Sequence, residues 1–236
     1  MDSFHMDEKN TQKKTIVFAT SSPRRKQMLQ QFGLDFRFVD PIGDERIKHG
    51  NESPLEYVQS LATQKARSVF EAVPKNAIIF AADTVVVLGD RVIGKPINRT
   101  EAEETLKNLS GSHHQVITAI CVFDMAKDVY LEETTTTKVH MRDYGDGEIR
   151  LYVETGDPMD KAGSYAIQND FFNPVEAIEG CYFSVVGLPI CTLLKILTQL
   201  KLKTIIDVEK HKRDFSKCTG CLMLSPLNRS QIITEL

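Results

Sequence analysis

The stretch Thr20-Ser21-Ser22-Pro23-Arg24-Arg25 marks a turn between a strand and a helix near the start of the chain. The apolar run Thr15–Ala19 before it predicts a short buried strand, and the amphipathic pattern after it predicts a helix that Gly33 ends. Ser22 suits the N-cap and Pro23 the first helical position. The two arginines oppose the helix dipole, but beside the free N–H groups they would form an anion site. The stretch therefore indicates either a phosphate-binding turn or a solvated basic turn.

Composition sets the broad class of the protein. The chain has 236 residues, of which 42% are hydrophobic and 26% charged, enough for one large α/β domain or two small ones. The net charge is −3 and the isoelectric point about 6.1, so no overall basic field favours nucleic acid or a membrane. The chain has no run of about 18 apolar residues, so the sequence predicts no membrane span. Residues 1–14 are polar and predict a disordered leader rather than a secretory signal.

The five cysteines are odd in number and scattered, which favours a reducing compartment and a cytoplasmic location over a disulfide framework. Cys218 and Cys221 have the spacing of a zinc knuckle, but a structural zinc ion needs four ligands, and His211 is the only nearby candidate for a third. Two free thiols in a polar tail are the favoured interpretation, with a zinc site as the alternative.

Apolar runs alternate with helical patterns, which predicts an α/β protein with a mixed sheet. The expected domain covers residues 15–206, followed by a mobile or loosely docked tail over 207–236. Gly89-Asp90 predicts a hairpin. The expected strands are Thr15–Ala19, Phe36–Val39, Ala77–Asp83, Val85–Leu88, Gln115–Asp124 and Val129–Arg142, and the expected helices are Pro23–Phe32, Pro54–Val73, Thr100–Leu109, Gly147–Thr155 and Pro189–Leu202.

Three charged residues interrupt apolar patterns, as functional residues often do. Asp83 lies among apolar strand residues, where a carboxylate suits a general base or a metal ligand, although it could also cap a strand end. Lys65 follows Val58 by seven residues and so falls within the apolar stripe of its helix. Its ammonium group could face an anion or extend past the edge of the core. Lys95 lies between Gly94 and Pro96, where it could turn back toward Asp83.

Gln168 follows the mixed segment Asp160–Ile167 and can both donate and accept hydrogen bonds, as recognition of a nucleobase requires. A plain surface loop is the alternative. His113-His114 suggests a metal only weakly, because no third ligand lies at suitable spacing, so a loop or strand-edge role is favoured. The candidate set would suit a polyphosphate ester bound with a hard divalent cation. It comprises Arg24, Arg25, Lys65, Lys95, Asp83 and Gln168, with Glu45 as a possible second acid.

Several short motifs, taken in their order, resemble the Maf family of nucleoside triphosphate pyrophosphatases from about Ile16 to Leu200. They are Ser22-Pro23-Arg24-Arg25, Lys65-Ala66, Ala82-Asp83-Thr84, Gly94-Lys95-Pro96, Leu109-Ser110-Gly111 with His114-Gln115-Val116, Asp160-Lys161-Ala162-Gly163 and Gly187-Leu188-Pro189. Each motif alone is weak, whereas the ordered set is specific.

The resemblance implies a fold and an activity. The fold would be an elongated mixed sheet flanked by helices, with two lobes around a nucleotide cleft, as in inosine triphosphatase-like proteins. The activity would be cleavage of a nucleotide between its α- and β-phosphates, giving a monophosphate and pyrophosphate in nucleotide house-cleaning. The resemblance further implies dependence on Mg²⁺ or Mn²⁺ and a homodimer.

Residue roles also follow from the resemblance alone. It makes Asp83 the general base and a metal ligand, with Glu45 as a second metal-linked acid. It makes Arg25, Lys65 and Lys95 phosphate ligands, with Ser22 in the same substrate-binding turn. It makes Arg24, Thr84 and Gln168 the base-reading trio, which resembles the branch preferring dTTP and UTP. The chain departs from the family at Asn169-Asp170, where glycine is usual.

Two other functions stay open on the sequence. One is a nucleotide-sensing regulatory module linked to cell division, with little turnover. The other is a nucleic-acid-binding protein that uses the same four cations. The negative net charge and the lack of a stripe of interleaved aromatic and basic residues disfavour the second.

Overall fold

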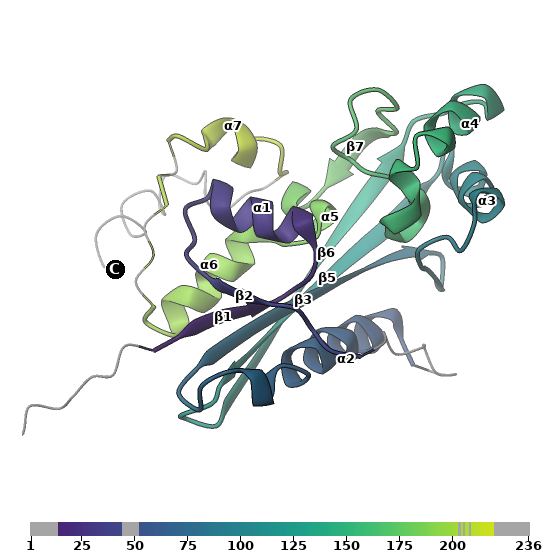
Figure 1. Ribbon diagram of the computed structural model, residues 1–236. Coiled ribbons are helices and arrows are strands. Elements are labelled where there is room, and N and C mark those ends of the chain that lie inside the picture. The colour runs from purple at the N-terminus through teal and green to yellow at the C-terminus, as the bar shows by residue number, and fades with distance from the viewer. Residues whose placement is uncertain (1–13, 44–51, 203, 205, 208, 220–236) are drawn as a thin grey trace, which may run out of the picture.

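A seven-stranded mixed sheet with helices on both faces forms the structure, which is a computed structural model describing residues 14–43, 52–202, 204, 206, 207 and 209–219 (Figure 1). The strand order is β2-β1-β3-β5-β6-β7, and β4 pairs with β3. Strand β1 runs parallel to β2 and β3, and the other pairs are antiparallel. The strands are β1 Ile16–Ala19, β2 Arg37–Val39, β3 Ile78–Leu88, β4 Arg91–Ile93, β5 His113–Asp124, β6 Val129–Met141 and β7 Val175–Glu179. The predicted α/β class with an elongated mixed sheet is confirmed.

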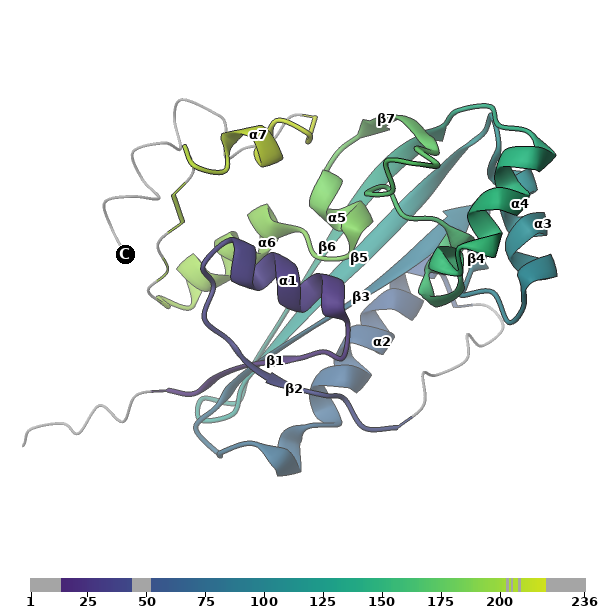
Figure 2. The ribbon, with the colours of Figure 1, turned by 45° about the horizontal axis from the view of Figure 1, so that its top comes forward.

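The helices pack on both faces of the sheet at one end and form a separate pair at the other end. The helices are α1 Pro23–Gln31, α2 Pro54–Arg67, α3 Arg99–Leu109, α4 Asp146–Glu154, α5 Tyr182–Val186, α6 Ile190–Gln199 and α7 Lys212–Phe215. Helices α1, α5 and α6 cover one face at the β1 end and α2 covers the opposite face, while α3 and α4 pack at the far end (Figure 2). No helix in the described ranges has the length and apolar character needed to cross a bilayer.

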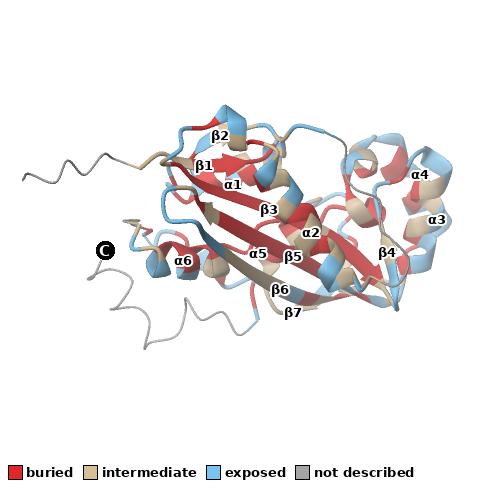
Figure 3. Cartoon of the chain, turned by 90° about the horizontal axis from the view of Figure 1, so that it is seen from below, coloured by how far each residue is buried: buried red, intermediate tan, exposed pale blue. Residues whose placement is uncertain are grey.

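Three apolar clusters make the core, and the buried strands run between them (Figure 3). Two clusters lie on opposite faces of the sheet under α1 and α2, and they make one lobe. The third lies under α3 and α4 and makes the other lobe. The two lobes expected from the resemblance are therefore built on one sheet, with β3, β5 and β6 extending through both.

The expectation of two separate strands, Ala77–Asp83 and Val85–Leu88, was wrong, because β3 runs unbroken from Ile78 to Leu88. Strand β5 pairs with it along this length, with Asp83 opposite Ala119 and Thr84 opposite Thr118. Continuous pairing satisfies the backbone groups on both sides of the carboxylate, so the polar residue does not end the strand. Asp83 is therefore a mid-strand residue.

Helix α2 is shorter than predicted. Ser53 begins it with a capping box, in which its hydroxyl accepts from the Glu56 amide and the Glu56 carboxylate accepts from the Ser53 amide. The helix ends at Arg67, and a 3₁₀ turn at Phe70–Ala72 replaces its predicted last turns. The Ser68 hydroxyl donates to the Lys65 carbonyl, which satisfies one of the free carbonyls at the helix end.

Sequence periodicity did not predict β7, α5 or α7. Strand β7 pairs with the end of β6 across an irregularity at His140 and Met141, which disturbs the alternation of inward and outward residues. Helices α5 and α7 are too short to show a helical period. Part of the segment expected to be a mobile or loosely docked tail packs into the core, where Phe215 is fully buried. The predicted domain limits stay a prediction.

One edge of β3 leaves a gap in the sheet. Strand β1 pairs with β3 up to Ala81, and β4 pairs with it from Val86 onward. Among the described residues, no strand pairs with the intervening residues 82–85 on this edge. The chain leaves β1 at Ala19 and turns into α1 beside this gap. The fold therefore places the predicted anion-binding turn next to Asp83 and Thr84.

Candidate active site

A cavity of about 300 Å³ opens at the gap beside β3. Most of its lining comes from six parts of the chain, and Pro41 and Val116 complete it. The six parts are the turn into α1, the inner side of α2, the middle of β3, the end of β4 with the residues after it, the loop around residues 160–165, and the end of α5 with Gly187. On α2 the lining residues are Tyr57, Leu61 and Lys65, which are four residues apart and so share one side of the helix.

Asp83 and Lys65 form the central ion pair of this cavity. Nζ of Lys65 donates to Oδ2 of Asp83 at 2.7 Å, and the Thr84 amide donates to Oδ1 at 2.7 Å. The side chains of Lys65 and Asp83 are 18% and 10% exposed, so the pair is largely shielded while both residues line the cavity. Lys65 thus faces the cavity from within the apolar stripe of α2, rather than extending into open solvent.

Arg25 is held by two elements of the fold. Its Nε donates to the Gly187 carbonyl at 2.8 Å, and its Nη2 donates to the Thr84 hydroxyl at 3.1 Å. Gly187 follows α5 with φ of 123°, a conformation that favours glycine. A guanidinium group is planar and carries five donors, so these two bonds fix its orientation at the cavity. Arg25 is 8% exposed and lines the cavity.

Thr118 contacts Arg25 indirectly, through the Thr84 hydroxyl, and no sequence pattern identified it as a functional residue. It is fully buried on β5, its hydroxyl donates to the Ser184 carbonyl at 2.9 Å, and it lies 2.9 Å from the Thr84 hydroxyl. With its own hydrogen used on Ser184, Thr118 accepts from Thr84, which in turn accepts from Arg25. The hydroxyl of Thr84, expected to read the base, thus contacts Arg25 and Thr118.

We expect Thr118→Val to weaken the hydrogen bonds that hold the Arg25 guanidinium group in position. The change keeps the shape but leaves the buried Ser184 carbonyl without its donor, which should lower the free energy of unfolding by about 1–2 kcal/mol. The Michaelis constant for nucleotide should rise more than kcat falls. Urea unfolding and steady-state kinetics measure the two effects, and Thr118→Ser should restore both. An unchanged Michaelis constant in a folded Thr118→Val protein would contradict the role of this hydroxyl.

The remaining predicted residues lie in different places. Ser22, Arg24 and Lys95 line the cavity together with the residues above. Gln168 is exposed and is not among the lining residues. Glu45 lies outside the described residues. Ser22 occupies the N-cap position of α1 without a side-chain capping bond, so its hydroxyl does not compete with an anion for the α1 amides.

The loop around residues 160–165 is fixed by Lys161, whose importance the sequence did not reveal. Lys161 is 7% exposed, and its Nζ donates to the carboxylates of Asp157 and Asp160 at 2.9 and 2.6 Å. The Gly163 amide donates to the Gly94 carbonyl at 3.1 Å, which ties the loop to the residue before Lys95. The cluster of acids around one buried lysine therefore fixes one wall of the cavity.

Asn169, at the departure from the family pattern, bridges two parts of this loop. Its Nδ2 donates to the Asp157 carboxylate at 3.2 Å, and its Oδ1 accepts from the Phe172 amide at 2.8 Å. Burial favours the neutral acid, but hydrogen bonds from Tyr152 and Lys161 outweigh it and lower the pKa of Asp157. The asparagine thus replaces glycine with a side chain that is itself hydrogen-bonded.

A buried His114–Tyr165 pair lies against the cavity wall. Nε2 of His114 is 2.7 Å from the Tyr165 hydroxyl, and Tyr165 lines the cavity. Burial, aided by the nearby His113 and His140, lowers the pKa of His114 to about 4. The imidazole is therefore neutral near pH 7 and can hydrogen-bond the phenol. His114 therefore lies buried in strand β5, opposite Val139 of β6, and not in a loop.

The pH dependence of stability should reveal this histidine. The unfolded chain binds a proton near pH 6.5, whereas the folded pKa is about 4, so stability should fall as pH drops between these values. The loss should reach ~3 kcal/mol. We expect His114→Gln, whose amide can still reach Tyr165, to flatten the dependence of the melting temperature on pH between 7 and 4. Equal pH dependence in both proteins would contradict this assignment.

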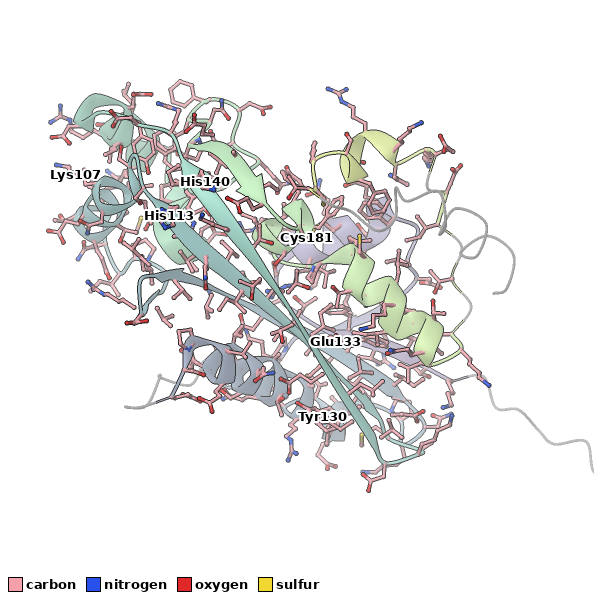
Figure 4. The ribbon with its side chains drawn as sticks, turned by 180° about the vertical axis from the view of Figure 1, so that it is seen from behind. Lys107, His113, Tyr130, Glu133, His140 and Cys181 are labelled. Atoms are coloured by element: carbon pink, nitrogen blue, oxygen red, sulfur yellow. The ribbon has the colours of Figure 1, made fainter. Side chains whose placement is uncertain are left out.

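His113 lies apart from the cavity. It is opposite His140 across β5 and β6, with ring centroids 6.0 Å apart, at the end of the sheet near α3 (Figure 4). Nε2 of His140 is 2.6 Å from the Glu179 carboxylate. The described residues hold no group of three or more His, Cys, Asp or Glu side chains arranged for a metal ion.

Comparison with known proteins shows the family. The model of the family described as "Maf-like protein" matches residues 15–200. The chain belongs to the Maf family. Three Maf relatives named "dTTP/UTP pyrophosphatase" come from Dictyoglomus thermophilum, Pelotomaculum thermopropionicum and Dehalococcoides mccartyi, with 43, 42 and 40% identity. The alignments cover 80, 78 and 82% of this chain and 97, 95 and 86% of those relatives.

Two solved structures show only distant similarity to this Maf chain. A nucleoside-triphosphatase/dITP/XTP pyrophosphatase from Mycobacterium abscessus aligns with a TM-score of 0.35 and 11% identity over 54% of this chain and 74% of its own. A HAM1 protein from Coxiella burnetii aligns with a TM-score of 0.37 and 16% identity. This alignment covers 54% of this chain and 73% of the HAM1 chain. The Maf assignment rests on the sequence match and not on these two structures.

Proposed function

We propose that this chain hydrolyses nucleoside triphosphates, with dTTP and UTP preferred, at the bond between the α- and β-phosphates. The observation that carries the proposal is the Lys65–Asp83 pair at 2.7 Å, in a cavity that Arg25 and Lys95 also line. One shielded carboxylate in a cavity that cations also line suits an anionic substrate and an attacking water. The relatives named "dTTP/UTP pyrophosphatase" support the choice of substrate.

In this proposal each residue acts through its position in the cavity. Asp83 accepts the proton of the water that attacks the α-phosphorus, and pyrophosphate leaves with the electrons of the broken P–O bond. Arg25, Lys65 and Lys95 neutralise the charge that grows on the leaving pyrophosphate. The α1 turn with Ser22 binds phosphate oxygens. Arg24 and Gln168 contact the base, and Thr84 serves the pocket by orienting Arg25.

A divalent metal, Mg²⁺ or Mn²⁺, fits this site by the chemistry of its donors. Asp83 offers two carboxylate oxygens at the cavity, and Mg²⁺ typically binds one or two carboxylates together with substrate phosphates. Asp83 would hold the ion, and the proposal retains Glu45 as its second carboxylate. When bound, the metal supplies charge neutralisation at the phosphate oxygens. The Lys65 ammonium holds the carboxylate in place from the side of α2.

The test is incubation of the purified protein with a panel of nucleoside triphosphates, with Mg²⁺, Mn²⁺ or EDTA, and separation of the products by chromatography. Monophosphate and pyrophosphate, formed fastest from dTTP or UTP and only with metal, are the expected result. No cleavage with either metal would overturn the enzyme assignment. Nucleotide binding without cleavage would then favour the regulatory module, and salt-dependent binding of single-stranded DNA would favour the nucleic-acid protein.

Gln168 provides a separate test of base recognition. We expect Gln168→Glu to weaken the preference for pyrimidine nucleotides, because the amide donor is replaced by a second acceptor oxygen. The ratio of kcat/KM for UTP to that for GTP measures the effect. Asn169→Gln, beside it in the loop, is not a suitable control because Asn169 holds Asp157 and Phe172. The exposed Asp170→Asn is suitable, and an unchanged ratio in Gln168→Glu would remove Gln168 from this role.

Assembly and location are further parts of the proposal. A homodimer is proposed from the family resemblance, and sedimentation equilibrium tests it. A cytoplasmic location is proposed because the five cysteines are odd in number and scattered along the chain, which does not suit a disulfide framework. Cys221, the second half of the candidate zinc pair, lies outside the described residues.

A further inference from the structure

A segment beyond the family match packs against the helix that carries the arginines. The family model ends at residue 200, whereas residues 209–219, here called the C-terminal clamp, include α7 and lie beside α1 and α5 (Figure 2). The relative from Dictyoglomus thermophilum is matched over 97% of its length by 80% of this chain. The clamp is thus an addition to the part of the chain shared with such relatives.

Three aromatic rings join the clamp to both helices. Phe215 of α7 is fully buried, with ring centroids 5.4 Å from Phe32 at the end of α1 and 5.5 Å from Phe183 in α5. Phe32 and Phe183 also contact each other at 5.3 Å. The His211 ring lies 4.6 Å from Phe32 on the clamp side. Phe215 therefore completes a triangle that sets the distance between α1 and α5.

Hydrogen bonds also connect the C-terminal clamp to the end of α1 and to the residues just before α5. The Thr219 amide donates to the Gly180 carbonyl at 2.9 Å, and the Thr219 hydroxyl accepts from the Gly180 amide, just before α5. The Gln31 amide group donates to the Asp214 carboxylate at 3.0 Å at the end of α1. The clamp thus contacts α1 and the entry to α5 through separate hydrogen bonds as well as through the aromatic triangle.

These two helices hold both ends of the Arg25 hydrogen bond. Arg25 lies in the first turn of α1, and the Gly187 carbonyl that accepts from its Nε follows directly after α5. A displacement of the first turn of α1 relative to the end of α5 would therefore alter this bond. We propose that the C-terminal clamp sets the position of Arg25, which makes Phe215 a positioning residue for the anion-binding end of the cavity. This inference rests on the proposed function of that site.

The test uses the full chain with Phe215→Leu, which keeps an apolar side chain and removes the ring. Pyrophosphate binding with Mg²⁺ is measured by calorimetry, because it reports the anion site without turnover. We expect the dissociation constant to rise ~10-fold, since displacement of a charged ligand residue by a fraction of an ångström is costly. Phe215→Met, whose unbranched side chain is longer and more adaptable than that of leucine, should show a smaller loss. In an Arg25→Gln background, Phe215→Leu should have no further effect.

Two controls separate positioning from general destabilisation. Ile149→Ala removes a buried side chain of α4, which packs at the other end of the sheet from α1 (Figure 2). It should lower the melting temperature without changing pyrophosphate binding. Lys212→Ala changes an exposed residue of α7 itself and should change neither. Pyrophosphate binding at the wild-type level in Phe215→Leu would overturn the proposal, and so would a loss that persists unchanged in the Arg25→Gln background.

Hydrogen exchange separates this inference from the proposed function. Phe215→Leu should speed amide exchange in α1 and α5 while leaving α4 at the wild-type rate. That result supports the clamp even if the wild-type protein cleaves no nucleotide. Wild-type exchange rates in α1 and α5 of the variant would refute the clamp, whatever the enzyme does. An inactive wild-type protein that still binds pyrophosphate would count against the proposed function alone.

Discussion

Asp83→Asn is expected to lower kcat by at least ~10²-fold, the scale on which a positioned general base contributes. Asparagine keeps the size of the side chain but cannot accept the proton of water. It also leaves Lys65 without the carboxylate that now lies 2.7 Å from its ammonium group. Release of pyrophosphate from dTTP at saturating substrate measures the effect, with circular dichroism to show that the variant is folded.

Asp124→Asn is the matched control for this experiment. Asp124 is also a buried carboxylate paired with a lysine, at 2.7 Å from Lys14, but it lies outside the cavity lining. Its loss should reduce stability and leave kcat near the wild-type value. Turnover close to wild type in a folded Asp83→Asn protein would remove Asp83 from the role of base.

Arg25→Lys should lower kcat/KM by ~10²- to 10³-fold, as the loss of one well-placed donor to a developing oxyanion does. Lysine carries the same charge, but its single nitrogen cannot bind the Gly187 carbonyl and the Thr84 hydroxyl while also facing a phosphate. The effect should appear in both KM and kcat, because the β- and γ-phosphates are already anionic in the bound substrate and gain further negative charge as the P–O bond to the α-phosphorus breaks. Steady-state kinetics with UTP measure it.

Lys26→Ala is the control for Arg25. Lys26 is the next residue of α1 and pairs with Asp40 at 2.9 Å, where the aspartate is 68% exposed. An exposed pair of this kind contributes little, so activity and stability should both stay near wild type. A kcat/KM for Arg25→Lys equal to that of Lys26→Ala would show that charge alone, rather than the geometry of the guanidinium group, matters at this position.

Much of the fold follows from patterns that act locally. The turn from β1 into α1, the starts of α2 and α3, and the long β5–β6 ribbon all depend on residues close in sequence, and they lie within a few residues of the predicted limits. Strand β7 and helix α5 are defined by their partners on β6 and β5 rather than by their own short sequences. Local periodicity therefore had too few residues to reveal them.

The candidate site shows the same division. Asp83 and Lys65 stood out because each breaks an apolar pattern, and the structure brings them into contact. Thr118 could not stand out, since a threonine within a strand is ordinary, and its value comes from Thr84 and Ser184, which are distant in sequence. Lys161 was visible as a charge, but its burial depends on Asp157 and on the fold of the loop.

The uninterrupted passage of β3, β5 and β6 through both lobes limits how the molecule can move. Strands β5 and β6 are twelve and thirteen residues long and pair in continuous register. They form one rigid unit, because a hinge within them would break several backbone hydrogen bonds at once. Rigid-body rotation of one lobe against the other therefore has no hinge within this sheet. Adjustment around a bound nucleotide should occur instead at the edge of the cavity, in Lys95 and the α1 turn, while Asp83 in the middle of β3 stays in place.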